Sequence, residues 1–242
     1  MNSIITLKAF SDNYIYLYQC DQKNAVVIDP GDCAPVLQAL KKHNLSLTAI
    51  LATHHHWDHI GGIADLKRET GCKIIGGDAK RISAVDNVVT DGQILTFGNI
   101  TTKVIATPGH TSTSVCYYIP KNEQNKNGIL FTGDTLFVGG CGRLLECDAK
   151  TMWESLKKLA TLPDDTKVYC GHEYTLENYE FAMQIEPGNP SILQQIAEIK
   201  QTIQQGNPTV PSTLAQEKAI NVFLRADSAE IFAELRRRKD LY

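Results

Sequence analysis

The pattern H-x-H-x-D-H and three later residues that each follow a glycine supply seven nitrogen or oxygen ligands for metal ions. These residues are His54, His56, Asp58, His59, His110, Asp134 and His172. A single structural zinc ion takes four ligands and often uses cysteine. Seven ligands without a required sulfur therefore predict two metal ions that share one ligand and a water, the arrangement used for metal-assisted hydrolysis.

The first segment, residues 54–59, is predicted to divide its side chains between the two ions. In extended backbone alternate residues point the same way, so His54 and His56 would face one ion and His55 would face away from it. Asp58 and His59 follow at a turn where two glycines leave space. These two residues would bind the neighbouring ion.

The three later residues complete the set, although each also has a simpler explanation. His110 and His172 would complete one ligand shell each, and Asp134 would bridge the two ions. Taken alone, each histidine would be a satisfied surface or core residue, Asp134 a turn residue, and Asp58 the cap of a helix. Asp29 either forms a turn or orients a histidine. The occurrence of the later residues together with H-x-H-x-D-H favours the metal site.

The chain that must position these residues alternates short strands with turns and a few helices. Apolar patterns of period two predict strands, and apolar spacings of three and four residues predict helices. Strands are expected at residues 4–9, 14–19, 25–29, 48–52, 73–75, 93–97, 101–106, 114–119, 129–131 and 167–170, the first three as an antiparallel meander. Helices are expected at residues 35–43, 60–69 and 152–160. Every proposed ligand then ends a strand or opens a loop, where functional residues are common.

Beyond His172 the strand patterns disappear and helical patterns take over. Helices are expected at residues 176–185, 191–204 and 229–237, separated by turns that contain proline and glycine. This change of pattern predicts a boundary near residue 170, with a first domain at residues 1–170 and a helical domain at residues 171–242.

The bulk composition narrows the classes of protein that remain. The 242 residues carry a net charge of −3, which argues against an extended surface for nucleic acid. We expect no signal peptide and no membrane span, because no apolar stretch approaches the ~18 residues required. Seven cysteines without a C-x-x-C motif are read as reduced thiols, which predicts a cytoplasmic protein. We expect it to be a monomer.

The motifs along the chain resemble those of the metallo-β-lactamase superfamily and, within it, of the glyoxalase II family, the hydroxyacylglutathione hydrolases. H-x-H-x-D-H with later His, Asp and His is the mark of the superfamily. The narrower resemblance rests on residues 10–14, 53–62, 134–137, 140–143, 169–174, 221–225 and 236–239. It implies an α+β fold, the αββα four-layer sandwich of the metallo-β-lactamase fold, followed by a C-terminal helical domain that binds substrate.

The resemblance also assigns roles to individual residues. It implies His54, His56 and His110 on one ion, Asp58, His59 and His172 on the other, and Asp134 as the bridge. It further implies that four residues hold glutathione, namely Arg143, Tyr174, Arg236 and Lys239. The family usually has an aromatic residue two positions after the basic residue at 143, and here Leu145 stands there. Histidine and carboxylate ligands suit zinc, iron and manganese, and zinc is the ion we expect.

The implied reaction is hydrolysis of an S-(2-hydroxyacyl)glutathione, above all S-D-lactoylglutathione, as in methylglyoxal detoxification. Two metal ions would activate the attacking water, with Asp58 and Asp134 as the catalytic carboxylates. The leaving thiolate has a pKa of about 8.5 and needs little help from an acid. A persulfide dioxygenase, with one iron and oxygen consumption, is an alternative. A phosphodiesterase on the same ligands would want a basic patch, and this chain has one short basic run at residues 236–239.

Overall fold

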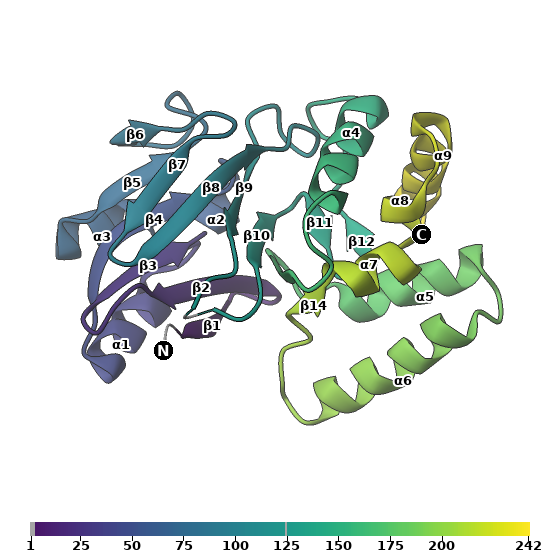
Figure 1. Ribbon diagram of the computed structural model, residues 1–242, viewed down its shortest axis with the longest axis horizontal. Helices are drawn as coiled ribbons and strands as arrows, with labels where there is room; N and C mark the ends of the chain where they lie inside the picture. Colours follow the sequence, from purple (N-terminus) through teal and green to yellow (C-terminus); the bar gives the residue numbers. More distant parts are fainter. Residues whose placement is uncertain (1–2, 124) are drawn as a thin grey trace.

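Two six-stranded β-sheets lie at the centre of the computed structural model, which describes residues 3–123 and 125–242 (Figure 1). The order of the first sheet is β1 (Ile4–Ala9), β2 (Asn13–Gln19), β3 (Asn24–Ile28), β4 (Ser46–Ala52), β5 (Lys73–Gly76) and β6 (Asn87–Val88). Strands β1 to β3 pair antiparallel, which confirms the predicted meander. Strands β3 to β6 then pair in parallel, so the chain leaves β3 and β4 at the same edge of the sheet.

The second sheet collects strands from the middle and from the end of the chain. Its order is β14 (Ser212–Thr213), β13 (Lys167–Cys170), β10 (Ile129–Gly133), β9 (Val115–Ile119), β8 (Ile100–Ala106) and β7 (Ile94–Phe97). All neighbours are antiparallel except β10 and β13, which run parallel. A small separate pair consists of β11 (Leu136–Phe137) and β12 (Gly140–Cys141).

Alternation along the strands explains why the two sheets stack with helices outside. On β2, Tyr16 and Tyr18 point toward the second sheet, and the ring centroid of Tyr16 lies 5.4 Å from that of Phe131. Ile15 and Leu17 of the same strand point the other way, into a second core. This second core lies beneath the helices α1 (Cys33–His43) and α3 (Ile63–Thr70). A strand that is buried on both faces fits the predicted αββα sandwich, and the fold class is confirmed.

The predicted helix at residues 60–69 was wrong in its start and in its continuity. A short helix α2 (Trp57–Ile60) precedes Gly61 and Gly62, and α3 begins only after them. A Cβ on Gly61 would lie 2.6 Å from the carbonyl oxygen of Gly31, so the turn after β3 packs closely against this segment. The N–H of Gly62 donates to the carbonyl oxygen of Pro30 at 2.9 Å and not to the preceding helical turn, which interrupts the helix. Asp58 consequently lies inside α2 and does not cap a helix that starts at residue 60.

The C-terminal region contains helices that gather on one side of the molecule, next to β10 to β14 (Figure 1). They are α5 (Thr175–Ile185), α6 (Pro190–Gln204), α7 (Leu214–Ile220), α8 (Val222–Arg225) and α9 (Ala229–Asp240), next to α4 (Ala149–Ala160) from the middle of the chain (Figure 1). Asn189 and Ser228 cap α6 and α9 with their side chains, as expected for helix starts. The prediction that strands end at His172 was wrong, because β14 adds to β13. A strand of two residues is too short to show a periodic pattern.

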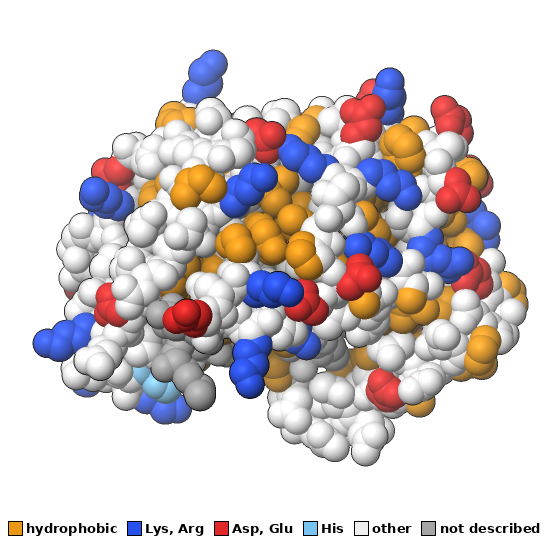
Figure 2. All heavy atoms as spheres, viewed as in Figure 1, with side chains coloured by type: hydrophobic (Ala, Val, Ile, Leu, Met, Phe, Trp, Pro, Cys, Tyr) orange, Lys and Arg blue, Asp and Glu red, His pale blue; other side chains and the backbone are white. Residues whose placement is uncertain are grey.

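Charged side chains of both signs share the visible surface. On the face of the molecule seen in Figure 2, Lys and Arg side chains are interspersed with Asp and Glu side chains. This mixed surface fits the small net charge of −3. Within residues 3–123 and 125–242, no helix combines the length and the apolar character that a membrane crossing requires.

Candidate metal centre

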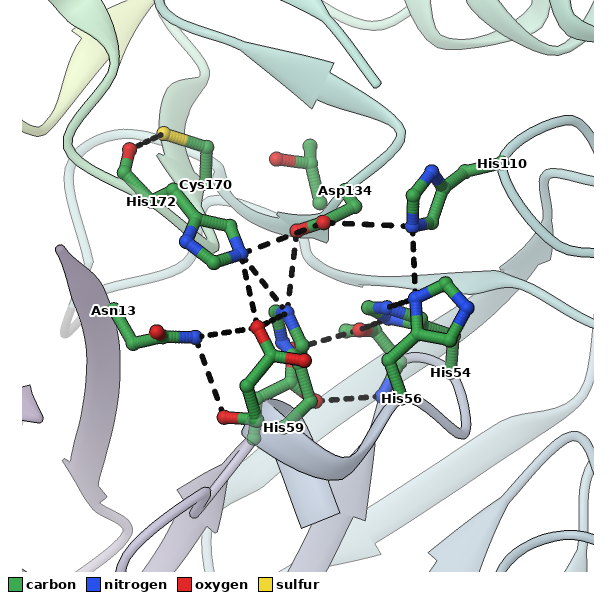
Figure 3. Close-up of polar contacts among 12 residues, drawn as sticks. Asn13, His54, His56, His59, His110, Asp134, Cys170 and His172 are labelled. Atoms are coloured by element: carbon green, nitrogen blue, oxygen red, sulfur yellow. Dashed lines mark hydrogen bonds and ion pairs between the residues drawn. The ribbon is translucent and has the colours of Figure 1, made fainter. Parts of the chain in front are cut away.

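Three histidines converge from two loops at the edge where the two sheets meet. His54 and His56 follow β4, and His110 follows β8 (Figure 3). The Nε2 atom of His54 lies 3.1 Å from Nδ1 of His56, and Nε2 of His110 lies 3.0 Å from the same Nδ1. The three nitrogen atoms are thus close enough to ligate one metal ion.

The outward nitrogens of this group are fixed by acceptors. The Thr53 hydroxyl donates to Asp29 over 2.6 Å, so it can only accept from Nδ1 of His54, which lies 3.0 Å away. Nδ1 of His110 lies 2.9 Å from the carbonyl oxygen of Arg143, which is also an acceptor. Both rings therefore carry their hydrogen on Nδ1, and the lone pair on Nε2 points inward, ready for a metal ion.

A second group forms where α2 meets the loop after β13. Nε2 of His59 lies 3.2 Å from Nε2 of His172, and each is 3.4 Å from Oδ2 of Asp58. On the outward side, Nδ1 of His59 lies 3.1 Å from Asp29, and Nδ1 of His172 lies 2.8 Å from Asp12. Carboxylates accept hydrogen bonds, so these rings also point a lone pair toward each other. Two lone pairs at this distance repel unless a cation lies between them.

Asp134 lies between the two groups, in the loop after β10 (Figure 3). Its Oδ1 is 3.4 Å from Nε2 of His59, and its Oδ2 is 3.4 Å from His172 and 3.5 Å from His110. Oδ1 is buried, and no residue within 3–123 and 125–242 donates a hydrogen bond to it. A Cβ on Gly171 would come within 2.5 Å of this oxygen, so the glycine permits the close approach. An orphaned buried carboxylate oxygen beside inward lone pairs fits divalent cations.

The charges of the two groups differ. Burial lowers the pKa of His54 and His56, which keeps them in the neutral form that binds metals. Burial acts in the same direction on His59 and His172, but the carboxylate of Asp134 outweighs it. The pKa of His59 is raised, and that of His172 is raised to about 10. Without a metal ion, this second group would take up protons to balance its carboxylates, which is the positive charge a metal ion supplies.

A cavity of about 430 Å³ opens beside both groups. All four residues proposed to hold glutathione line it, namely Arg143, Tyr174, Arg236 and Lys239. The ring of Tyr174 stacks on that of His172, with centroids 4.8 Å apart and planes 2° from parallel. Leu145 is 58% exposed and does not line the cavity. The metal-type ligands and the cations of α9 therefore face one space.

Sequence reasoning missed several residues that contact the site. Asn13 donates to Oδ2 of Asp58 over 2.9 Å, and Asp12 receives the hydrogen bond of His172 described above. Glu177 and Asn178, in the first turns of α5, line the cavity. Apart from the resemblance over residues 10–14, no spacing in the chain singles these residues out, because their partners lie far away in sequence.

A charged cluster ties together three loops at the rim of the site. Arg81 forms short ion pairs with Asp78 and Glu146. Glu146 accepts hydrogen bonds from the backbone and hydroxyl of Ser112, at 2.7 and 2.8 Å, and lies 3.5 Å from Nε2 of His55. The cluster thus connects the segments that carry His54, His110 and Arg143, and the ring of His55 points to it.

Comparisons with known proteins agree in both halves of the chain. A family model for the metallo-beta-lactamase superfamily matches residues 10–172, and one for the hydroxyacylglutathione hydrolase C-terminus matches residues 173–242. A hydroxyacylglutathione hydrolase of Chromohalobacter salexigens is 47% identical over 94% of this chain and 88% of its own length. One of Rhodospirillum rubrum is 43% identical over 97% and 96%. The crystal structure of ETHE1 from Myxococcus xanthus is similar with a TM-score of 0.74 and 28% identity, over 99% of this chain and 92% of that one.

Proposed function

The chain belongs to the hydroxyacylglutathione hydrolases of the metallo-β-lactamase superfamily, and we propose that it hydrolyses S-(2-hydroxyacyl)glutathione to glutathione and a 2-hydroxy acid. S-D-lactoylglutathione, which yields D-lactate in methylglyoxal detoxification, is the substrate we expect. One observation carries the proposal: a single cavity is lined by metal-type ligands on one side and by Arg143, Arg236 and Lys239 on the other. A thioester whose thiol part carries carboxylates needs the metal-type ligands for hydrolysis of its carbonyl and the cations for binding its carboxylates.

Two divalent metal ions would bind at the converging atoms, and zinc is the element we expect. The proposed ligands are His54, His56 and His110 for one ion and Asp58, His59 and His172 for the other. Asp134 would be shared, because its oxygens lie 3.4 to 3.5 Å from histidines of both groups. When bound, the ions would polarise the thioester carbonyl and lower the pKa of a water molecule. Iron and manganese suit the same ligands, so metal analysis of the purified protein decides the element.

Residues of the chain itself would position the attacking water. Asp58 and Asp134 both line the cavity, so their carboxylates can accept a hydrogen bond from the attacking water. The hydrogen bond from Asn13 fixes the orientation of Asp58. The thiolate product, with a pKa of about 8.5, leaves without a dedicated acid. A serine or cysteine nucleophile is not required either, because the attacking group would be a water molecule activated by the bound ions.

The thiol part of the substrate would lie against the cations and Tyr174. Burial raises the pKa of Tyr174, so its hydroxyl remains protonated and can donate a hydrogen bond. Arg236 and Lys239 stand three residues apart on α9 and share a face of that helix. A guanidinium can bind a carboxylate with two hydrogen bonds, and the ammonium adds a second positive charge.

We propose that residues 1–170 form the metal-binding domain and residues 171–242 the substrate-binding domain. His172 and Arg143 cross this division, because the first would ligate metal and the second would bind substrate. The seven cysteines are free thiols, which supports a cytoplasmic location. A monomer is expected, and size-exclusion chromatography with light scattering tests that expectation.

Turnover of S-D-lactoylglutathione by the purified protein, with metals quantified by mass spectrometry, tests the function. We expect hydrolysis that disappears after chelation and returns with added zinc, and about two metal ions per chain. Consumption of oxygen with glutathione persulfide, one bound iron and no thioester hydrolysis would instead identify a persulfide dioxygenase and refute the proposal.

A further inference from the structure

The ammonium group of Lys239 is buried at the wall of the cavity. Its side chain is 6% exposed, and Nζ lies 5.5 Å from the ring centre of Phe181 and 4.7 Å from that of Tyr242. Aromatic faces attract a cation but do not replace full hydration. A buried ammonium therefore needs a counter-charge.

Glu177 supplies this counter-charge. Its carboxylate makes a short contact with Nζ of Lys239, and its side chain is 60% exposed. It lies in the first turn of α5 and lines the same cavity. Arg236 differs, because it pairs with Asp240 of its own helix at 2.9 Å and donates to the carbonyl of Cys141 at 2.9 Å. The partner of Lys239 thus stands where a ligand must enter.

We propose that Glu177 is an internal counter-ion of Lys239 that the terminal carboxylate of the substrate displaces, so that Glu177 sets the affinity for glutathione thioesters. This inference rests on the proposed function. Two carboxylates cannot share one ammonium without repulsion. Glu177 is the carboxylate that yields, because its exposed side chain can rotate into water at little cost. The exchange keeps Lys239 paired throughout, and it weakens the binding of both the substrate and the released glutathione.

Glu177→Gln tests the proposal, with Glu180→Gln as the matched control. Glu180 lies on the same helix and pairs with Lys200 at 3.5 Å, away from the cavity. We expect Glu177→Gln to lower KM for S-D-lactoylglutathione, and the calorimetric dissociation constant of glutathione, by about two- to fivefold, the range for exposed ion pairs. The effect on KM should exceed any effect on kcat. Glu180→Gln should change neither constant, and thermal melting reports the folding of both variants.

A second pair of measurements separates competition from a structural role. With Lys239→Met already present, Glu177→Gln should no longer lower KM. With the D-lactoyl thioester of N-acetylcysteamine, which lacks a carboxylate, Glu177→Gln should leave KM unchanged. An unchanged or raised dissociation constant for glutathione in Glu177→Gln would overturn the inference. If the wild-type enzyme does not hydrolyse S-D-lactoylglutathione, the proposed function fails, and glutathione calorimetry still decides the role of Glu177.

Discussion

Two walls of the cavity hold their side chains in different ways. The metal-binding wall carries the proposed metal ligands, and the cation wall carries Arg143, Arg236 and Lys239. On the metal-binding wall, the histidines are hydrogen-bonded from behind by groups such as Asp29, which is 3% exposed. On the cation wall, Arg236 and Lys239 pair with Asp240 and Glu177, whose side chains are 42% and 60% exposed. The first wall is therefore fixed before any ligand arrives, whereas the second holds charge pairs that a ligand can exchange.

This difference predicts which kinetic constant each wall controls. A buried, hydrogen-bonded arrangement costs little reorganisation during the reaction, and its loss lowers kcat. Ion pairs near solvent contribute little to stability, and replacing their members changes the affinity for charged ligands. Substitutions on the metal-binding wall should therefore act on kcat and metal content, and substitutions on the cation wall should act on KM.

The strongest test of this division is Asp134→Asn. This change keeps the shape of the side chain but removes the charge that both histidine groups share. We expect kcat to fall by about 10³-fold, because both the bound metal and the attacking water depend on this carboxylate. Steady-state kinetics and metal analysis measure the effect. A kcat within tenfold of wild type at full metal content would contradict the proposed bridging role.

A smaller effect is expected from the residues behind the histidines. Asp29→Asn should lower metal affinity or kcat by about 10- to 100-fold, because it weakens the support of His59 and Thr53. Asparagine tolerates the φ of 50° at this position, so the backbone should persist. Asp12→Asn should cost less, because the side chain of Asp12 is 33% exposed and water can replace it. A larger loss in Asp12→Asn than in Asp29→Asn would reverse this ranking.

The contrast between the walls also explains what the sequence could predict. H-x-H-x-D-H is local, and the strands before His54, His110 and His172 have clear apolar patterns. The motif and the later residues together predicted one site, and the strand patterns placed each ligand at the end of a strand or in a loop. Local patterns did not reveal that Gly61 interrupts a helix, because the cause is the distant turn at Gly31. The pairing of Lys239 with Glu177 was missed as well. It joins α9 to α5, and the spacing of residues within each helix does not predict how two helices pack together.

On the cation wall, Lys239→Met should raise KM for S-D-lactoylglutathione by about tenfold, the usual range for a hydrogen bond to a charged group. Its effect on kcat should be smaller, because Lys239 does not contact the metal ligands. Arg238→Met, an exposed neighbour on the same helix, is the control and should leave KM unchanged. A fall in kcat alone would show that the two walls are not separate.

The smallest effect is expected at the rim, where Arg81 pairs with Asp78 and Glu146. Burial acts to raise the pKa of both acids, but their hydrogen bonds, including those from Arg81, hold each at about 2. Because folding lowers the pKa of these acids, their charged forms stabilise the folded protein at pH values above the ordinary pKa, which is 4.5 for Glu146. This contribution is lost as the pH falls toward 2. Arg81→Met should therefore lower the free energy of unfolding by about 1 kcal/mol at pH 7, a figure reduced for solvent exposure. The difference from wild type, measured by urea unfolding of metal-free proteins, should shrink between pH 4.5 and 2. A difference that persists at the acidic end would mean that Arg81 acts through packing and not through charge.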